Sequence, residues 1–307
     1  MNRSILLADA LNTHWAVIPE RLATYSSVLH RWASGQAATH DVLASIEADK
    51  TARAARSQST QLASSGGIAV LKLYGVITQR GNMLDDLSGA GATSTQKFSN
   101  ALREALADDS IGQILIDIDS PGGNVYGVGE LAAEIFAARG QKPIVAIANS
   151  LAASAAYWIG AQASEFYVTP GGEVGSIGVY MMHQDCSAYM EAEGIKTTFI
   201  QAGAHKTEGN GYAPLGAEAQ EFLQSRTNDY YTAFIKAVAK GRGVNLDAVR
   251  NDMGQGRCFG ADAALAAKMV DGIATFDDVL RKMQKQAKST RTAPQLARAQ
   301  RELSILG

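Results

Sequence analysis

The sequence predicts an α/β protein whose sheet is mostly parallel and is covered by helices on both faces. Two observations lead to this prediction. Segments with strand character alternate with segments of helical periodicity from about residue 68 to residue 280. The strand segments are continuous apolar runs, which are typical of strands buried on both faces. With 307 residues, 46% of them hydrophobic, the chain is long enough to bury a large core.

The predicted elements follow one another in chain order. Strands are expected at 68–77, 111–119, 142–149, 164–170, 175–181 and 196–202. Helices are expected at 94–108, 127–140, within 148–163, at 216–241, and as short segments at 245–253, 260–269 and 276–285. In the first of these helices Phe98, Leu102 and Leu106 share one face, which indicates that it packs on the sheet.

The chain divides into four zones. Residues 1–47 predict an N-terminal helical extension, because Pro19 opens a segment with Leu22, Tyr25, Leu29 and Trp32 at helical spacing. Residues 48–67 are interpreted as a polar linker and residues 68–280 as the main body. Residues 281–307 carry seven Lys or Arg against one acid and predict a basic C-terminal tail, either solvated or used for docking or processing.

Composition excludes several classes of function. The net charge of −2 provides no overall attraction for nucleic acid or for an anionic membrane. The two cysteines are far apart and the five histidines form no HxxxH pair, so neither a disulfide scaffold nor a metal site is expected. No cofactor motif such as a P-loop is present, and no secretory signal or long apolar run is found. A protein of the cytoplasm, without cofactor or membrane span, is expected.

A glycine pair follows the strand predicted at 111–119, in the stretch 117–125 (DIDSPGGNV). Glycines at the carboxyl end of a strand leave backbone N–H groups facing outward with no side chain in the way. Ligands of open α/β sheets bind at this edge, where such groups can hold a phosphate or the oxyanion of acyl transfer. A plain Pro-Gly turn explains this motif equally well.

The stretch 148–163 (ANSLAASAAYWIGAQA) joins the end of another predicted strand to a helix. Ser154 is expected in the first turn of that helix, where small alanines leave room for a substrate backbone. Ser150 is the better candidate for an N-cap, and a structural serine at either position is the alternative. Both motifs fall on one edge of a parallel sheet, so together they favour a serine nucleophile whose oxyanion hole is built from Gly123 and the N–H of Ala155.

A serine nucleophile needs a base within hydrogen-bond reach. Two candidates lie downstream: His183, after the strand predicted at 175–181, and Lys206, in a glycine-rich loop. Histidine is the commoner base because its pKa lies near neutrality, whereas a lysine has to be kept neutral by burial. The residues alone leave this choice open.

Four motifs together resemble those of the signal-peptide-peptidase-A-like serine peptidases. They are DIDSPGGNV (117–125), NSLAASAAYWIG (149–160), GSIGVYMMHQD (175–185) and IQAGAHKTEGNGYAPL (200–215). The match is closest to the phage branch, which includes the capsid-maturation proteases of lambda-like phages. The resemblance covers about residues 66–275 in order and without large gaps.

This resemblance implies a crotonase-like (Clp protease-like) fold of repeated β-β-α units and a Ser/Lys dyad acting through an acyl-enzyme. Ser154 matches the nucleophile and Lys206 the general base. Gly123 and the amide of Ala155 match the oxyanion hole, and Ser176 is a further hydroxyl that would orient the lysine. Many relatives have glycine where this chain has Ala155, and small size is retained.

The resemblance also implies an ATP-independent serine endopeptidase that binds an extended polypeptide. A phage scaffold protein is the expected substrate, the chain's own tail is a second candidate, and a homo-oligomeric ring is expected because relatives assemble into rings. Three alternatives remain: a Clp-like Ser/His/Asp triad using His183 with Asp185 or Asp229, a non-catalytic capsid or scaffold-binding component, and an acyl-CoA enzyme on the same broad fold.

Overall fold

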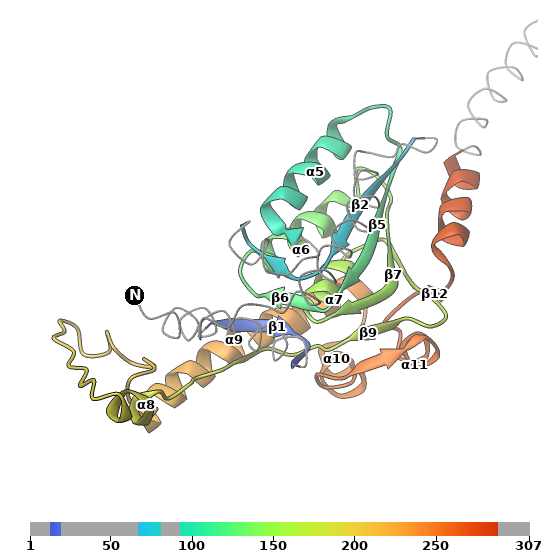
Figure 1. Ribbon diagram of the computed structural model, residues 1–307. Helices are drawn as coiled ribbons and strands as arrows, with labels where there is room; N and C mark the ends of the chain where they lie inside the picture. The colour runs from blue at the N-terminus through green and yellow to red at the C-terminus, as the bar shows by residue number, and fades with distance from the viewer. Residues whose placement is uncertain (1–12, 20–66, 81–92, 288–307) are drawn as a thin grey trace, which may run out of the picture.

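The computed structural model describes residues 13–19, 67–80 and 93–287 (Figure 1). Its main sheet contains β2 (Ile68–Tyr74), β5 (Gln113–Ser120) and β7 (Ile144–Ala153), and both β8 (Glu165–Val168) and β9 (Glu173–Gly175) pair with β7. These pairs are all parallel, and β12 (Gly272–Ile273) joins β8 in the same sense. Only β11 (Cys258–Gly260), on β9, runs antiparallel among the described strands of this sheet. The predicted α/β architecture with a mostly parallel sheet is confirmed.

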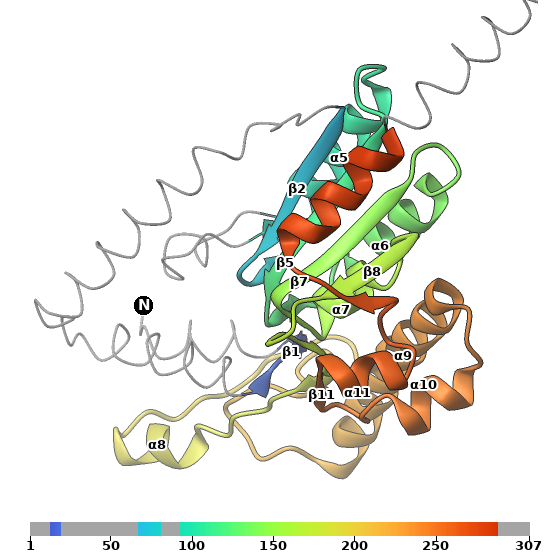
Figure 2. The same ribbon diagram turned by 90° about the vertical axis from the view of Figure 1, so that its right-hand side faces the viewer.

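Helices cover both faces of the main sheet, as the apolar strands predict. One face carries α5 (Thr95–Ala107), α6 (Val128–Ala138) and α7 (Ala155–Gly160), which share a large apolar cluster with the strands. The other face is covered by a helix at residues 276–287 (Figure 2). Val279 and Met283 of this helix are buried against Ile68, Leu115 and Ile147. The basic segment predicted as a tail from residue 281 therefore begins inside a packed helix, and its remainder at 288–307 lies outside the described residues.

A second, smaller sheet has the order β10 (Tyr180–Met181), β1 (His14–Val17), β6 (Gly122–Asn124), β3 (Ile77–Thr78) and β4 (Thr93–Ser94). β1 is antiparallel to both of its neighbours, β6 and β10, and all four of its residues are buried. Within the predicted N-terminal helical extension, His14–Val17 is thus a strand, because it is enclosed by strands distant in sequence. The helix predicted from Pro19 and nearly all of the linker at 48–67 lie outside the described residues.

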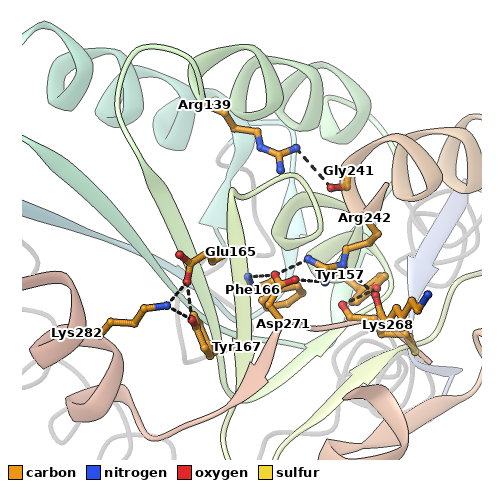
Figure 3. A network of polar contacts seen from close by, with 11 residues as sticks. Arg139, Tyr157, Glu165, Phe166, Tyr167, Gly241, Arg242, Lys268, Asp271 and Lys282 are labelled. Atoms are coloured by element: carbon orange, nitrogen blue, oxygen red, sulfur yellow. Dashed lines mark hydrogen bonds and ion pairs between the residues drawn. The ribbon is translucent and has the colours of Figure 1, made fainter. Parts of the chain in front are cut away.

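A polar network fixes the C-terminal elements to the main sheet (Figure 3). The guanidinium of Arg242, the last residue of α9 (Ala217–Arg242), donates to the carboxylate of Asp271 at 2.7 and 2.8 Å. The same carboxylate accepts from the backbone N–H of Phe166 in β8 at 2.7 Å. The hydroxyl of Tyr157 in α7 donates to the carbonyl of Met269 at 2.9 Å. These contacts tie α9 and residues 269–271 to the two elements, α7 and β8, that follow β7.

The remaining helices complete this end of the molecule, with α10 (Leu246–Asp252) and α11 (Ala261–Ala266) after α9. Residues 182–215 extend away from the body as an arm that holds only one short helix among its residues, α8 (Ser187–Ala192) (Figure 1). The strand predicted at 196–202 is wrong, because these residues lie in the arm and pair with none of the described strands. The strand predicted at 175–181 is split, since β9 ends at Gly175 and β10 begins at Tyr180.

Candidate active site

Ser154 occupies the turn between β7 and α7. It is the N-cap residue of α7, with φ 55° and ψ −117°, and its exposed fraction is 1%. A positive φ is uncommon for a residue with a side chain and marks a sharp turn that its surroundings enforce. β7 runs on to Ala153, four residues beyond the predicted end, so Ser150 is an exposed residue within a strand and not an N-cap.

Three hydrogen bonds position Ser154. Its backbone N–H donates to the carbonyl of Gly175 at 2.7 Å, and its carbonyl accepts from the N–H of Trp158 at 2.9 Å. Its hydroxyl donates to the carbonyl of Gly178 at 3.5 Å, which is long for an O–H donor and holds Oγ weakly. The indole of Trp158 stacks on Phe234 of α9, with ring centroids 4.6 Å apart. The backbone of the turn is thus firmly held while its hydroxyl remains free to turn.

The glycine pair lies directly beside Ser154. A Cβ added to Gly122, whose φ is +97°, would lie 2.2 Å from the carbonyl oxygen of Ala16 and 3.0 Å from the Cβ of Ser154. A Cβ added to Gly123 would lie 1.9 Å from the carbonyl oxygen of Ile77. Neither position has room for a side chain, so the close approach of three chain segments requires both glycines. The structure thereby brings together the two motifs that were expected at one sheet edge.

The N–H of Gly123 faces the carbonyl of Ala16. These two residues are opposite one another in the antiparallel pair of β1 and β6. Hydrogen bonds from Val125 N–H to the carbonyl of His14 (3.3 Å) and from Ile18 N–H to that of Pro121 (3.1 Å) lie two residues to either side. Hydrogen-bonded and non-bonded pairs alternate along an antiparallel ladder, so Ala16 and Gly123 form a hydrogen-bonded pair.

The amide expected as the other oxyanion donor belongs to Ala155, the first residue of α7. The first N–H groups of a helix have no acceptor within the helix, so this amide is available to an incoming oxygen. Ser176 is close by, because Gly175, the residue before it, accepts the backbone hydrogen bond from Ser154. Ser176 is buried and, like Ser154, has a positive φ, 53°.

Lys206 lies elsewhere, in the arm. It is exposed, and its backbone N–H donates to the carbonyl of Gly203 at 3.2 Å. Within the described part of the chain no hydrogen bond or ion pair joins Lys206 to Ser154 or to Ser176. A single chain in this conformation therefore brings Ser154 close to the two expected oxyanion donors and keeps the predicted base apart from them.

The groups of the alternative triad also have other partners. Nε2 of His183 lies 2.9 Å from the carbonyl oxygen of Asn210, within the arm. The carboxylate of Asp185 accepts from the N–H of Ser187 at 2.9 Å, and that of Asp229 pairs with Arg226 at 3.0 Å. Between residues 93 and 287 no hydrogen bond links His183 to Ser154 or to either aspartate.

One polar residue under the site was missed in the sequence. Asp117 of β5 is buried, and its carboxylate accepts hydrogen bonds from the hydroxyl of Tyr74 in β2 and, at 3.2 Å, from the amide of Asn149 in β7. Burial raises the pKa of this carboxyl, although both hydrogen bonds oppose the rise. The signal was visible as an acidic residue inside an apolar strand. The hydrogen bonds of Asp117 thus link β2, β5 and β7 just before the turn that carries Ser154.

One group of side chains in and beside the arm has the composition of a metal site. His205, Glu208 and Glu218 bring one ligand atom each within 4.8 Å of one another. The Nδ1 atom of His205 contacts the carboxylate of Glu208, and this hydrogen bond raises the pKa of the imidazole. All three are at least partly exposed, and among the described residues no hydrogen bond or ion pair joins them to Ser154, so the cluster is separate from the candidate active site.

The long helices give no candidate membrane span: within the described ranges, none combines sufficient length with an uncharged apolar sequence.

Comparison with known proteins matches residues 137–290, half of the chain and including Ser154 and Lys206, to peptidase family S49. The head-tail preconnector protein GP5 of Enterobacteria phage P21 is 32% identical over 248 residues, covering 78% of this chain and 49% of GP5. The capsid assembly protease C of Escherichia phage lambda is 32% identical over 214 residues, covering 70% of this chain and 48% of the protease. The chain thus spans about half the length of these phage relatives.

A putative signal peptide peptidase SppA of Enterococcus faecium is 28% identical over 229 residues, covering 74% of this chain and 66% of that protein. Among solved structures, a mutant of the 1510-N membrane-bound stomatin-specific protease has a TM-score of 0.42 and 17% identity, covering 70% of this chain and 83% of that one. The resemblance to SppA-like peptidases and their phage branch is confirmed, and the chain belongs to peptidase family S49.

Proposed function

We propose that this protein is a serine endopeptidase in which Ser154 is the nucleophile and Lys206 the general base. The observation that carries the proposal is the turn at Ser154, which lies against a glycine strand whose N–H at Gly123 faces the carbonyl of an extended segment. A peptidase needs these parts: a hydroxyl at a tight turn, an oxyanion donor beside it, and a strand edge that binds a polypeptide. Membership of family S49 supports the same reaction.

The proposed mechanism assigns a role to each predicted residue. Lys206 in its neutral form accepts the proton of the Ser154 hydroxyl as Oγ attacks the scissile carbonyl. The N–H groups of Gly123 and Ala155 hold the oxyanion, and the lysine ammonium then gives its proton to the leaving amine. Water releases the acyl-enzyme, with Lys206 again as base, and Ser176 orients the lysine.

Lys206 has to reach a Ser154 side chain to act as its base, and the exposed arm that carries Lys206 offers a surface for contact with another copy. Four large apolar side chains of the arm, Tyr189, Ile195, Phe199 and Ile200, are exposed, the last of them completely at 100%. Exposed large apolar side chains that gather in one segment are typical of a contact surface. We infer that the protein is a homo-oligomer, a ring as the family resemblance implies, in which the arm of one copy packs on the next and brings Lys206 to a Ser154 of the assembly.

The names of the two phage relatives point to a biological setting. They are a head-tail preconnector protein and a capsid assembly protease, and each covers most of this chain. On that ground we propose that the substrate is a phage scaffold protein, cut during capsid maturation in the host cytoplasm or inside the prohead. The chain's own segment at 281–307 is a second candidate substrate.

Labelling of the purified protein with a fluorophosphonate tests the catalytic assignment. We expect mass spectrometry to find the label on Ser154, to find none in Lys206→Ala, and to find full labelling in His183→Ala. Lys196→Ala is a matched control, because Lys196 is also an exposed lysine of the arm. Absence of label in the wild-type protein, or equal labelling of the two lysine variants, contradicts the proposed dyad.

Mixing two inactive variants tests the proposed assembly. If the arm completes the site of a neighbouring copy, Ser154→Ala and Lys206→Ala mixed at equal concentration regain part of the wild-type peptidase activity. A mixture that stays as inactive as either variant alone, under conditions in which subunits exchange, contradicts a dyad shared between subunits.

A further inference from the structure

β1 lies between two other strands of the smaller sheet and pairs with both of them. Trp15 is opposite Asn124 of β6 on one side and Tyr180 of β10 on the other. The chain therefore places four of its own N-terminal residues, fully extended, between the glycine strand and the strand that leads into the arm. A strand enclosed in this way has the geometry of a bound polypeptide held by its backbone.

The register of β1 sets one peptide bond at the nucleophile. The carbonyl of Ala16 faces the N–H of Gly123, the donor assigned to the oxyanion hole. A Cβ placed on Gly122 would lie 2.2 Å from the oxygen of this carbonyl and 3.0 Å from the Cβ of Ser154. The carbonyl of Ala16 and the side chain of Ser154 are therefore close to each other. If β1 shifted by one residue along β6, the carbonyl of Ala16 would no longer face Gly123. The pairing therefore places the peptide bond between Ala16 and Val17 at Ser154 for cleavage.

Side chains on both sides of β1 hold the residues that precede this bond. The amide of Asn124 donates to the hydroxyl of Thr13 at 3.2 Å. The ring of His14 packs on Tyr230 of α9, with centroids 4.9 Å apart. Trp15 and Ala16 are both buried, and Ala16 belongs to the large apolar cluster of the core. The body of the protein thus contacts successive residues up to the selected bond.

We propose that β1 is the first substrate of this site: it occupies the substrate groove, blocks it against other polypeptides, and is removed by cleavage between Ala16 and Val17. This inference rests on the proposed peptidase function. Ser154 Oγ forms an ester with the carbonyl carbon of Ala16 as the bond to the nitrogen of Val17 breaks, and the serine proton passes through the base to the new α-amine of Val17. One water then hydrolyses the ester and leaves a free carboxylate on Ala16.

The same contacts define the class of external substrate. In a segment that replaces β1, the residue before the cut takes the fully buried place of Ala16 in the apolar core, where a small side chain fits. The residue before that one takes the place of Trp15, in a buried position that accepts a large aromatic side chain. The preferred substrate is therefore an extended segment with an aromatic residue followed by alanine or glycine.

Intact-mass measurement of the purified full-length protein over time tests the proposal. We expect a product that begins at Val17 to accumulate in the wild type and to be absent in Ser154→Ala. Ala16→Ile places a bulky side chain before the bond and should slow the cut at least about tenfold, as added methylenes do in a fitted site. Ile18→Val, on the far side of the bond and half-buried, should cut at nearly the wild-type rate.

Cleavage of casein, measured in parallel, separates this proposal from the proposed function. We expect a lag before casein is cut, and we expect the lag to disappear once the protein has been incubated long enough to lose residues 1–16. Casein cleavage without a lag, by protein whose chain stays intact or is cut elsewhere, overturns the inference while the peptidase function stands. A protein that neither cuts casein nor takes up the fluorophosphonate overturns both.

Discussion

Replacing Gly123 by alanine is the sharpest structural test of the oxyanion assignment. The new Cβ would lie 1.9 Å from the oxygen and 2.5 Å from the nitrogen of Ile77, whereas real Cβ contacts stay above 3.0 Å. Both atoms are backbone, so β6 has to move away from β3 by roughly 1 Å, and misplacement by 1 Å costs on the order of 10²-fold in rate. Complete loss of one oxyanion donor costs about 10²–10³ in kcat, or about 2.7–4 kcal/mol.

The assay is kcat/KM on a fluorogenic peptide that contains His-Trp-Ala before the cleaved bond, with thermal unfolding followed in parallel. Crowding of this kind destabilises a protein by about 1–3 kcal/mol, so activity is measured below the unfolding transition of the variant. Gly112→Ala is the control, because its Cβ would lie 3.8 Å from the nearest atom, the oxygen of Gly67. If folded Gly123→Ala keeps kcat/KM within about threefold of the wild type, the oxyanion assignment fails, since the removal of one donor costs far more.

Two further predictions concern stability. Phe234→Ala should lower the free energy of unfolding by about 3–5 kcal/mol, because a fully buried ring that stacks on Trp158 is lost, and chemical denaturation that finds less than about 1 kcal/mol contradicts this packing. Burial acts to raise the pKa of Asp271, but hydrogen bonds from Arg242 and the N–H of Phe166 outweigh it and lower the pKa. Asp271 therefore stabilises the fold above the ordinary aspartate pKa of about 3.9 and stops doing so as the pH falls through the lower, folded value. Asp271→Asn should be less stable than the wild type at pH 7, and a difference that does not shrink below about pH 4 contradicts this linkage.

The main sheet was predictable because its strands are continuous apolar runs that need no partner to be recognised. The end of β7 was misplaced, since Asn149 and Ser150 are polar and small and resemble a turn. The structure continues the strand because Leu151, Ala152 and Ala153 pair with β9, a partner that lies beyond α7 in sequence. Local polarity indicates where a chain can leave a sheet, and pairing decides where it does.

β1 and the arm both show that strand formation cannot be predicted from a short segment alone. His14 to Val17 form a strand because β6 and β10, both more than a hundred residues away, enclose them. Residues 196–202 have the apolar and β-branched residues of a strand, yet none of the described strands pairs with them and they are irregular. Strand propensity depends on a pleated surface to pack against, and no pattern within a short segment contains that information.

Some parts of the candidate site could likewise be predicted from the sequence and others could not. Ser154 and the glycine pair were expected together because each follows the carboxyl end of a neighbouring parallel strand, which is a property of the topology. The position of Lys206 does not follow from topology, since the residues around it pair with no strand in the part of the chain that the structure describes. Asp117 was missed because a carboxyl inside an apolar strand reveals its partners only after the strands are aligned.

The position of β1 has a kinetic consequence for every polypeptide that approaches from outside. β1 is joined to the body by the chain, so its local concentration at the groove is set by the length of the connection and does not fall on dilution. An outside polypeptide therefore competes against a rival that belongs to the same molecule, and only its own concentration and affinity decide how well it competes. Weakly binding segments are therefore excluded at any protein concentration while β1 stays in place, and a change of the tether, with the site untouched, alters which polypeptides gain entry.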